Sequence, residues 1–251
     1  MDNYIVGIGE VLWDFFEDQN KYVLGGAPFN FAYHVNQFGL NSLVISAIGN
    51  DKLGQKLEAD IKEKNVPYML ERLNLPTGVV NVKEVDGKPR YDILIERAWD
   101  YIPNTEQLKE IAANTKAVCF GSLAQRSETS RNSILAFLDA MPSDALRIFD
   151  INLRQNWYTE EIIKTSLQKA NVLKINDDEY YEKKSLSKAR INYYTNEIKK
   201  AENRITYTGF LNKTMKHQAL LLNTGVENPT QSFIALVLAS KDKDGYTLVE
   251  V

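Results

Sequence analysis

Cysteine and histidine are scarce in this sequence of 251 residues, which has one cysteine, Cys119, and two histidines, His34 and His217. One cysteine cannot form an intramolecular disulfide or a multi-cysteine zinc site, and two histidines argue against a histidine-rich metal site. No apolar run approaches the ~20 residues that a membrane-spanning helix needs. The N-terminus enters a strand-like run without a basic, cleavable leader. We therefore expect a soluble, cytoplasmic protein that does not bind membranes.

Glycine and charge are unevenly distributed along the chain. The 30 Lys and Arg residues against 33 Asp and Glu give a net charge of −3, which argues against a nucleic-acid-binding protein. Residues 183–217 nevertheless hold nine Lys or Arg and two Glu, and residues 122–208 contain no glycine. This shift indicates a boundary near residue 183, and a solvated helical face explains it better than a nucleic-acid patch.

Hydrophobic patterning predicts strands that alternate with helices. Apolar runs bounded by turn residues predict strands at residues 4–8, 43–48, 117–120, 147–151 and 172–175. Helical periodicity predicts helices at residues 29–38, 52–64, 105–113, 128–140 and 160–169, with Asp51 as an N-cap. Such alternation is typical of an α/β fold with a mainly parallel sheet that helices cover on both faces.

A predicted hairpin interrupts this alternation. Asp86 and Gly87 lie between strand-like runs at residues 79–85 and 91–96, and Asp-Gly is a strong two-residue turn signal. We expect this hairpin to project from the main body. Beyond residue 183 the pattern predicts helices at residues 187–204 and 231–240 and strands at residues 205–207, 219–222 and 246–251.

The first strand leads into Gly-Ile-Gly-Glu-Val-Leu at residues 7–12, which suggests a dinucleotide-binding turn. That fingerprint needs a third glycine where Leu12 stands, and no helix opening follows. The better interpretation is a strand that delivers Asp14 to the carboxyl edge of the sheet, where open α/β folds bind ligands. A carboxylate there can accept hydrogen bonds from two sugar hydroxyls, although an ordinary surface aspartate is the alternative.

A glycine pair precedes the next predicted helix. Gly25 and Gly26 allow the backbone to approach a ligand closely, and Pro28 opens the helix at a position that needs no N–H donor. Asn30 then lies in the first turn, with its amide near the end of the helix where a ligand would bind. A plain glycine turn is the alternative interpretation.

The end of the strand at residues 147–151 carries three polar residues on alternate positions. Asp150, Asn152 and Arg154 alternate with apolar residues, and a period of two places all three on one side of an extended chain. Because a buried strand usually ends in one polar residue, three in register suggest a binding site.

Two more segments join strands to helices. Residues 49–54, Gly-Asn-Asp-Lys-Leu-Gly, are explained almost fully as a capped turn. Residues 176–179, Asn-Asp-Asp-Glu, follow the strand at residues 172–175. Their carboxylates either cap a helix or contribute to a magnesium or phosphate site.

Taken in order, these five segments resemble the PfkB family of carbohydrate kinases, which have the ribokinase-like fold, and within that family the fructokinases. The resemblance covers about residues 3–182. It implies a three-layer α/β fold, formed here by a single domain over residues 1–251, with a mainly parallel central sheet and a small β-sheet lid. The lid segments would be residues 10–24 and 76–100, and the predicted hairpin falls within the second of them.

The resemblance also implies an ATP-dependent sugar kinase that transfers the γ-phosphoryl group to a hydroxyl of fructose or a similar hexose. In the sugar site it places Asp14, Gly25, Gly26, Asn30 and Arg154. In the nucleotide and phosphate site it places Asn152, Asn176 and Glu179, and Glu179 would also bind Mg²⁺ through water. Such kinases often form homodimers through their lids.

The C-terminal part, residues 183–251, departs from the family pattern. The family carries a Gly-Ala-Gly-Asp segment whose backbone cradles the phosphoryl group and whose Asp is the catalytic base. Here the nearest aligned position is Gln231, and an amide cannot accept a proton as a carboxylate does. The hypotheses are therefore an active kinase with another carboxylate as the base, a catalytically impaired sugar-binding or regulatory homologue, or an altered C-terminal third. A dehydrogenase on a dinucleotide-binding sheet is a more distant alternative.

Overall fold

The computed structural model describes residues 3–85, 88–174, 206–207, 241–242 and 245–246. Several predictions lie outside these residues. They are the turn at Asp86 and Gly87, the helices at residues 187–204 and 231–240, the strand at residues 219–222, most of the strand at residues 246–251, and the site residues Asn176, Glu179 and Gln231.

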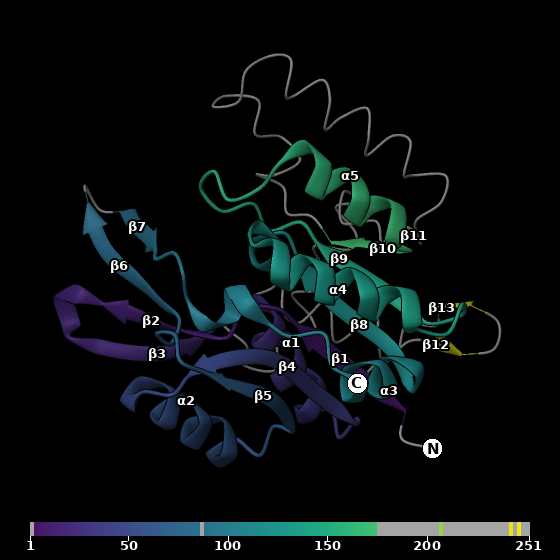
Figure 1. Ribbon diagram of the computed structural model, residues 1–251, viewed down its shortest axis with the longest axis horizontal. Helices are drawn as coiled ribbons and strands as arrows, with labels where there is room; N and C mark the ends of the chain where they lie inside the picture. The colour runs from purple at the N-terminus through teal and green to yellow at the C-terminus, as the bar shows by residue number, and fades with distance from the viewer. Residues whose placement is uncertain (1–2, 86–87, 175–205, 208–240, 243–244, 247–251) are drawn as a thin grey trace.

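A parallel central sheet organises the described chain (Figure 1). Its strand order is β11-β10-β9-β8-β1-β4-β5, and every neighbouring pair runs parallel. The seven strands are β1 (Tyr4–Ile8), β4 (Ser42–Gly49), β5 (Tyr68–Leu73), β8 (Thr115–Gly121), β9 (Leu146–Asp150), β10 (Val172–Lys174) and β11 (Thr206–Tyr207). The predicted parallel α/β sheet is therefore confirmed.

Among the described residues, five helices cover the two faces of this sheet and complete three layers (Figure 1). They are α1 (Ala27–Gln37), α2 (Lys52–Glu63), α3 (Glu106–Ala113), α4 (Glu128–Ala140) and α5 (Glu160–Lys169). Apolar residues of α3, α4 and α5 pack against Val118 and Phe120 of β8, whereas Phe31 and Val35 of α1 pack against Cys119. Because successive side chains of a strand point to opposite faces, β8 separates the two helical layers.

The central strands are apolar because water reaches neither face of the sheet. All eight residues of β4 are buried, and the parallel strands predicted from apolar runs agree with observed strands to within two residues at each described end. The strand β5 at the edge of the sheet was not predicted. Its sequence, Tyr-Met-Leu-Glu-Arg-Leu, is only partly buried and lacks both an apolar run and a strict alternation.

A second, four-stranded sheet stands beside the first and is called the small sheet below (Figure 1). Its order is β3-β2-β6-β7, with β2 parallel to β6 and the other pairs antiparallel. The strands are β2 (Leu12–Phe16), β3 (Lys21–Gly25), β6 (Val79–Val85) and β7 (Lys88–Ile93). The projecting hairpin is confirmed, although β7 begins earlier than predicted because Val85 pairs directly with Lys88.

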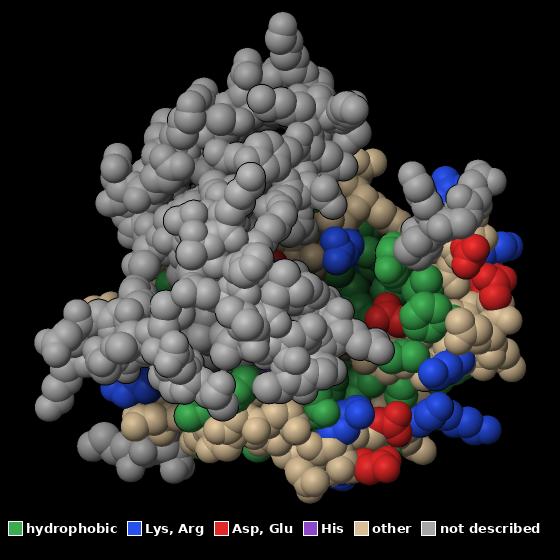
Figure 2. All heavy atoms as spheres, turned by 180° about the vertical axis from the view of Figure 1, so that it is seen from behind, with side chains coloured by type: hydrophobic (Ala, Val, Ile, Leu, Met, Phe, Trp, Pro, Cys, Tyr) green, Lys and Arg blue, Asp and Glu red, His purple; other side chains and the backbone are tan. Residues whose placement is uncertain are grey.

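The remaining described elements are short. They are the 3₁₀ helices η1 (Glu17–Gln19), η2 (Ala98–Tyr101) and η3 (Leu123–Arg126) and a two-stranded antiparallel sheet of β12 (Lys241–Asp242) and β13 (Gly245–Tyr246). In the described part of the chain, no helix is long and apolar enough to cross a membrane. On the face opposite Figure 1, acidic and basic side chains of the described residues are interspersed (Figure 2).

Candidate active site

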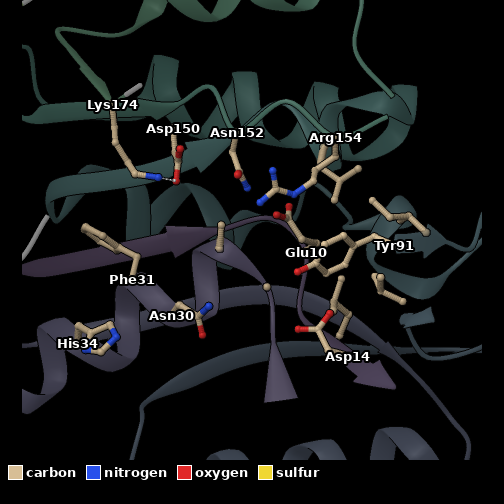
Figure 3. Close-up of a pocket in the computed structure, with 16 residues that line it drawn as sticks. Glu10, Asp14, Asn30, Phe31, His34, Tyr91, Asp150, Asn152, Arg154 and Lys174 are labelled. Carbon is tan, nitrogen blue, oxygen red and sulfur yellow. Dashed lines mark hydrogen bonds and ion pairs between the residues drawn. The ribbon is translucent and has the colours of Figure 1, made fainter. Parts of the chain in front are cut away.

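A pocket of about 250 Å³ lies between the carboxyl edge of the central sheet and the small sheet (Figure 3). Ligand sites in open α/β folds lie at this edge. The residues that line it come from the ends of central strands, the start of α1 and the inner face of the small sheet. They are Glu10, Leu12, Asp14, Gly26, Ala27, Asn30, Phe31, His34, Val80, Tyr91, Ile93, Leu123, Asp150, Asn152, Arg154 and Lys174.

The connection from β1 to β2 packs tightly against the start of α1. A Cβ atom built on Gly9, which has φ +144°, would lie 2.9 Å from the ring of Pro28. One built on Gly26, which has φ +110°, would lie 2.3 Å from the backbone oxygen of Glu10. Since side chains are disfavoured at both positions, these glycines allow the strand and the helix to meet at the pocket. After Gly9 the chain enters β2 and not a helix, so the dinucleotide-binding alternative is wrong.

Asp14 and Asn30 face the same space from two sides (Figure 3). Asp14 is on β2 of the small sheet, and Asn30 is in the first turn of α1. Gly25 does not line the pocket, but a Cβ atom built on it would lie 2.4 Å from Oδ2 of Asp14. Gly25 therefore leaves room for the Asp14 carboxylate, whereas Gly26 itself lines the cavity.

Asp150, at the end of β9, and Asn152 and Arg154 after it all line the pocket, but the reason predicted for this is wrong. The strand ends at Asp150, and Asn152 has a left-handed backbone with φ 35°, so the segment is not extended. Asp150 also forms a buried ion pair with Lys174, with 2.7 Å between Oδ2 and Nζ. The left-handed backbone of Asn152, and not strand periodicity, therefore sets how Asn152 and Arg154 line the cavity.

Burial raises the pKa values of two pocket carboxyls. It raises the pKa of Glu10 to about 7, with a smaller rise from the negative charge of Asp150 and a lowering from Arg154. It raises the pKa of Asp14 to about 6, and Arg154 opposes this rise. Both carboxyls therefore change protonation near neutral pH, as groups in functional sites often do.

Sequence reasoning missed four polar pocket residues, namely Glu10, His34, Tyr91 and Lys174. Two of them had a usable signal. Glu10 follows the end of β1, and Lys174 ends β10 next to Asp150 at the end of β9, where the two residues pair in register. Since parallel strands end at one edge, polar residues at those positions are candidates for the site. No local pattern of the sequence pointed to His34 or Tyr91.

The turn at residues 49–54 is a capped turn, as predicted. Asp51 accepts hydrogen bonds from the backbone N–H of Gly54 at 2.7 Å, from the backbone N–H of Thr77 at 2.9 Å and from the Thr77 hydroxyl at 2.6 Å. Burial raises its pKa, but the bonds from Thr77 and Gly54 outweigh this effect and lower the pKa of the carboxyl. The turn does not line the pocket, but it anchors the segment that leads into β6.

A buried arginine connects the base of the small sheet to the body of the protein. Arg126 binds both carboxylate oxygens of Asp100 at 2.8 and 2.9 Å and donates to the carbonyl of Leu94 at 2.7 Å. Its guanidinium carbon lies 4.1 Å from the ring centre of Trp99 and 4.8 Å from that of Trp157. Trp157 is in the loop that carries Arg154, so this cluster supports both the loop and the end of β7.

The structure does not test the predicted nucleotide and metal residues Asn176 and Glu179, which lie outside the described residues. In the described part of the chain, no group of three or more His, Cys, Asp or Glu residues is placed to hold a metal ion. The position of Asn152 in the pocket is consistent with a phosphate-binding role, but no contact in the structure establishes that role.

The three-layer α/β fold has its pocket at the carboxyl edge of the central sheet, the edge at which open α/β folds bind ligands. Residues 16–209 match the sequence pattern of the pfkB family carbohydrate kinases, and the chain belongs to that family. This confirms the resemblance drawn from the motifs, and the match continues beyond residue 182.

Individual relatives agree with this assignment. The chain is 28% identical over 166 residues to a fructokinase of Salmonella typhimurium, which covers 62% of this chain and 53% of the relative. The chain thus spans about half the length of this curated relative. Two solved structures share the fold. One is a fructokinase with bound ATP from Xylella fastidiosa, with a TM-score of 0.69 and 16% sequence identity over 82% of this chain and 67% of that chain. The other is an uncharacterized sugar kinase from Pyrococcus horikoshii, with a TM-score of 0.65 and 24% sequence identity over 72% of this chain and 65% of that chain.

Proposed function

We propose that this protein is an ATP-dependent sugar kinase of the fructokinase type, which transfers the γ-phosphoryl group of ATP to a hydroxyl of fructose or a similar hexose. The observation that carries the proposal is the pocket in which Asp14 of the small sheet and Asn30 of α1 face each other, in a chain that belongs to a carbohydrate kinase family. The family match and the likeness to fructokinases favour a kinase over a sugar-binding homologue without transfer.

The chemistry of the pocket residues suits a polyhydroxylated ligand. The carboxylate of Asp14 can accept hydrogen bonds from two hydroxyls, and the amide of Asn30 can both donate and accept. Arg154, which lines the pocket, supplies donors from a third direction, and its Nη1 donates a hydrogen bond to the carbonyl of Leu153 at 3.2 Å. Closure of the small sheet over the sugar would exclude water, which otherwise competes with the sugar as phosphoryl acceptor.

For the nucleotide we propose a site next to the sugar pocket, formed by Asn152, Asn176 and Glu179, with Mg²⁺ held through water by Glu179. Carboxylate and amide oxygens suit this hard cation, which keeps several of its waters. When bound, the ion neutralises charge on the phosphates. Among the described pocket carboxylates, Asp150 is already paired with Lys174, so these residues alone do not make a magnesium cage.

A homodimer formed through the small sheets is the proposed assembly. Val23, Val85 and Tyr91 of this sheet are exposed large hydrophobic residues, which a second copy would cover. Analytical ultracentrifugation of the chain and of Val23→Glu tests this proposal. We expect a dimer that dissociates in the variant, and a monomeric parent chain would contradict it.

Calorimetry tests the sugar site. Asp14→Asn removes the charge of the carboxylate with little change in shape, and we expect fructose affinity to fall at least tenfold. Asp92→Asn is the matched control, because Asp92 is an exposed carboxylate on β7 of the same sheet, and fructose affinity should stay within twofold. Unchanged fructose affinity in Asp14→Asn would overturn the assignment of the site, and a coupled assay without ATP turnover on any hexose would overturn the kinase assignment.

A further inference from the structure

Transfer of a phosphoryl group to a sugar hydroxyl releases the hydroxyl proton, so the site needs a proton acceptor. Three carboxylates line the described pocket, namely Glu10, Asp14 and Asp150. Asp150 is committed to its ion pair with Lys174. Asp14 lies on the small sheet, where the proposed function assigns it to holding the sugar. Glu10 is the pocket carboxylate that neither of these tasks uses.

The Glu10 side chain is buried and lines the pocket. The residue is 2% exposed, and its Oε2 atom is buried without a hydrogen-bond partner among the described residues. In Figure 3 its carboxylate points into the cavity, between Arg154 and the space bounded by Asp14 and Asn30. A buried carboxylate oxygen without a partner costs free energy, which a ligand hydroxyl in the pocket would recover.

Backbone N–H groups near this carboxyl act against the effect of burial. Those of Glu10 itself and, to a smaller extent, of Ala27 at the start of α1 lower its pKa. The positive end of the helix dipole favours the ionised form at this position. Oε2 has no hydrogen-bond partner among the described residues, so it is the oxygen that can take a proton from a ligand hydroxyl in the pocket.

We propose that Glu10 is the catalytic base of this protein, an inference that rests on the kinase function proposed above. In the transfer step the sugar oxygen forms a bond to the γ-phosphorus of ATP while the bond from that phosphorus to the β,γ-bridging oxygen breaks. The hydroxyl proton passes to Oε2 of Glu10, and ADP leaves with the bridging oxygen. Glu10 then releases the proton to water, which restores the ionised carboxylate for the next cycle.

The electrostatic surroundings support this role. Because burial raises the pKa of Glu10 to about 7, a large fraction of the group is ionised near neutral pH and yet basic enough to accept a proton. The titratable or charged groups that share its pocket or influence it come from several elements. They are Asp14 on β2, His34 on α1, Tyr91 on β7, Cys119 on β8, Asp150 on β9, Arg154 in the following loop and Lys174 on β10.

Steady-state kinetics of Glu10→Gln with ATP and fructose test the proposal. The amide has nearly the same shape as the carboxyl group, so a purely structural role predicts almost no change in turnover. We expect kcat to fall about 100-fold or more, the range seen when general base catalysis is lost. Fructose affinity, measured by calorimetry with a non-hydrolysable ATP analogue, should stay within threefold of the parent.

The pH profile gives a readout that a structural role would not change. In the parent, kcat at saturating fructose should fall tenfold per pH unit below about pH 7, because the protonated base cannot accept a proton. Glu10→Asp keeps a carboxylate and should retain an acid limb at a shifted pH, whereas the residual kcat of Glu10→Gln should be flat. If circular dichroism shows that Glu10→Gln does not fold, the profiles of the parent and Glu10→Asp decide the matter.

The outcomes separate the two proposals. Parent-like kcat in folded Glu10→Gln, or a parent kcat that is constant from pH 5.5 to 8, would overturn Glu10 as the base and leave the kinase function standing. A parent chain that transfers no phosphoryl group from ATP to any hexose would overturn the proposed function, and the role of Glu10 would fall with it.

Discussion

The side-chain amide of Gln155 donates a hydrogen bond of 2.5 Å to the backbone carbonyl of Tyr91. Gln155 follows Arg154 in the loop after β9, and Tyr91 is on β7 of the small sheet. Trp157 donates in turn to the side-chain oxygen of Gln155 at 2.7 Å. The loop that carries the pocket arginine is thus tied directly to the sheet that covers the pocket, so the positions of the two are coupled.

Removal of this link should weaken sugar binding more than stability. In Gln155→Ala the small sheet loses one contact that holds it over the pocket, and we expect KM for fructose to rise about two- to tenfold, as for one hydrogen bond. Because Gln155 is exposed, the free energy of unfolding should change by less than about 0.5 kcal/mol. Gln37→Ala, at the exposed end of α1, is the control. A KM equal to that of the control would show that the link has no role in binding.

The two neighbouring glycines should respond differently to alanine. Gly26 has a left-handed φ of +110°, and its new Cβ would lie 2.3 Å from the backbone of Glu10, so Gly26→Ala should lower the free energy of unfolding by about 2 kcal/mol or more. At Gly25 the Cβ would meet only side-chain atoms, with Oδ2 of Asp14 nearest at 2.4 Å.

Gly25→Ala should therefore fold nearly normally but bind fructose at least tenfold more weakly, because Asp14 must move aside. Urea unfolding and calorimetry on both variants measure the contrast. Equal losses of stability in the two variants, or normal fructose affinity in Gly25→Ala, would contradict this interpretation.

Loss of the Arg126 guanidinium should destabilise the protein strongly. Its side chain and that of Asp100 are 7% and 6% exposed, so Arg126→Met leaves an uncompensated buried carboxylate, which costs about 3–5 kcal/mol. Urea unfolding of this variant, of Asp100→Asn and of the double variant gives the coupling energy. We expect the double variant to be more stable than the sum of the single losses indicates. Additive losses would mean that the two residues act independently.

Folding stability should depend on pH through the two pocket carboxyls. Their pKa values of about 7 for Glu10 and about 6 for Asp14 are raised by burial from ordinary values of 4.5 and 3.8. Between about pH 4 and 7 the folded state therefore holds more protons than the unfolded state, and the free energy of unfolding falls as pH rises. The combined loss should be on the order of 6 kcal/mol and should be complete about one pH unit above the folded pKa of Glu10.

Urea unfolding of the parent and of Glu10→Gln across this range measures the effect, because the difference between the two curves isolates Glu10. We expect the variant to gain stability relative to the parent as the pH rises from about 4 to 7. A constant difference across the range would show that the Glu10 carboxyl is not buried in the folded protein.

Local signals in the sequence determined much of the fold. Apolar runs predicted the central strands because strands buried on both faces must be apolar, and Asp51 was recognisable as a cap because its carboxylate satisfies N–H groups at a helix start. Asp14 and Asn30 could be assigned to one site because the resemblance to the PfkB family places both residues in the sugar site. The edge strand β5 escaped prediction, since its pairing depends on β4 and not on its own pattern.

Only the tertiary structure decided the electrostatics of the pocket. Asp150 pairs with Lys174 because β9 and β10 bring residues 24 positions apart into register. The pKa of Glu10 is raised because the folded chain buries this carboxyl. The left-handed backbone of Asn152, just before Arg154, was also not predictable, because a period of two assumes an extended chain. Sequence patterns record which side chains a local segment must bury, whereas protonation and pairing depend on the distances between segments, which exist only once the chain has folded.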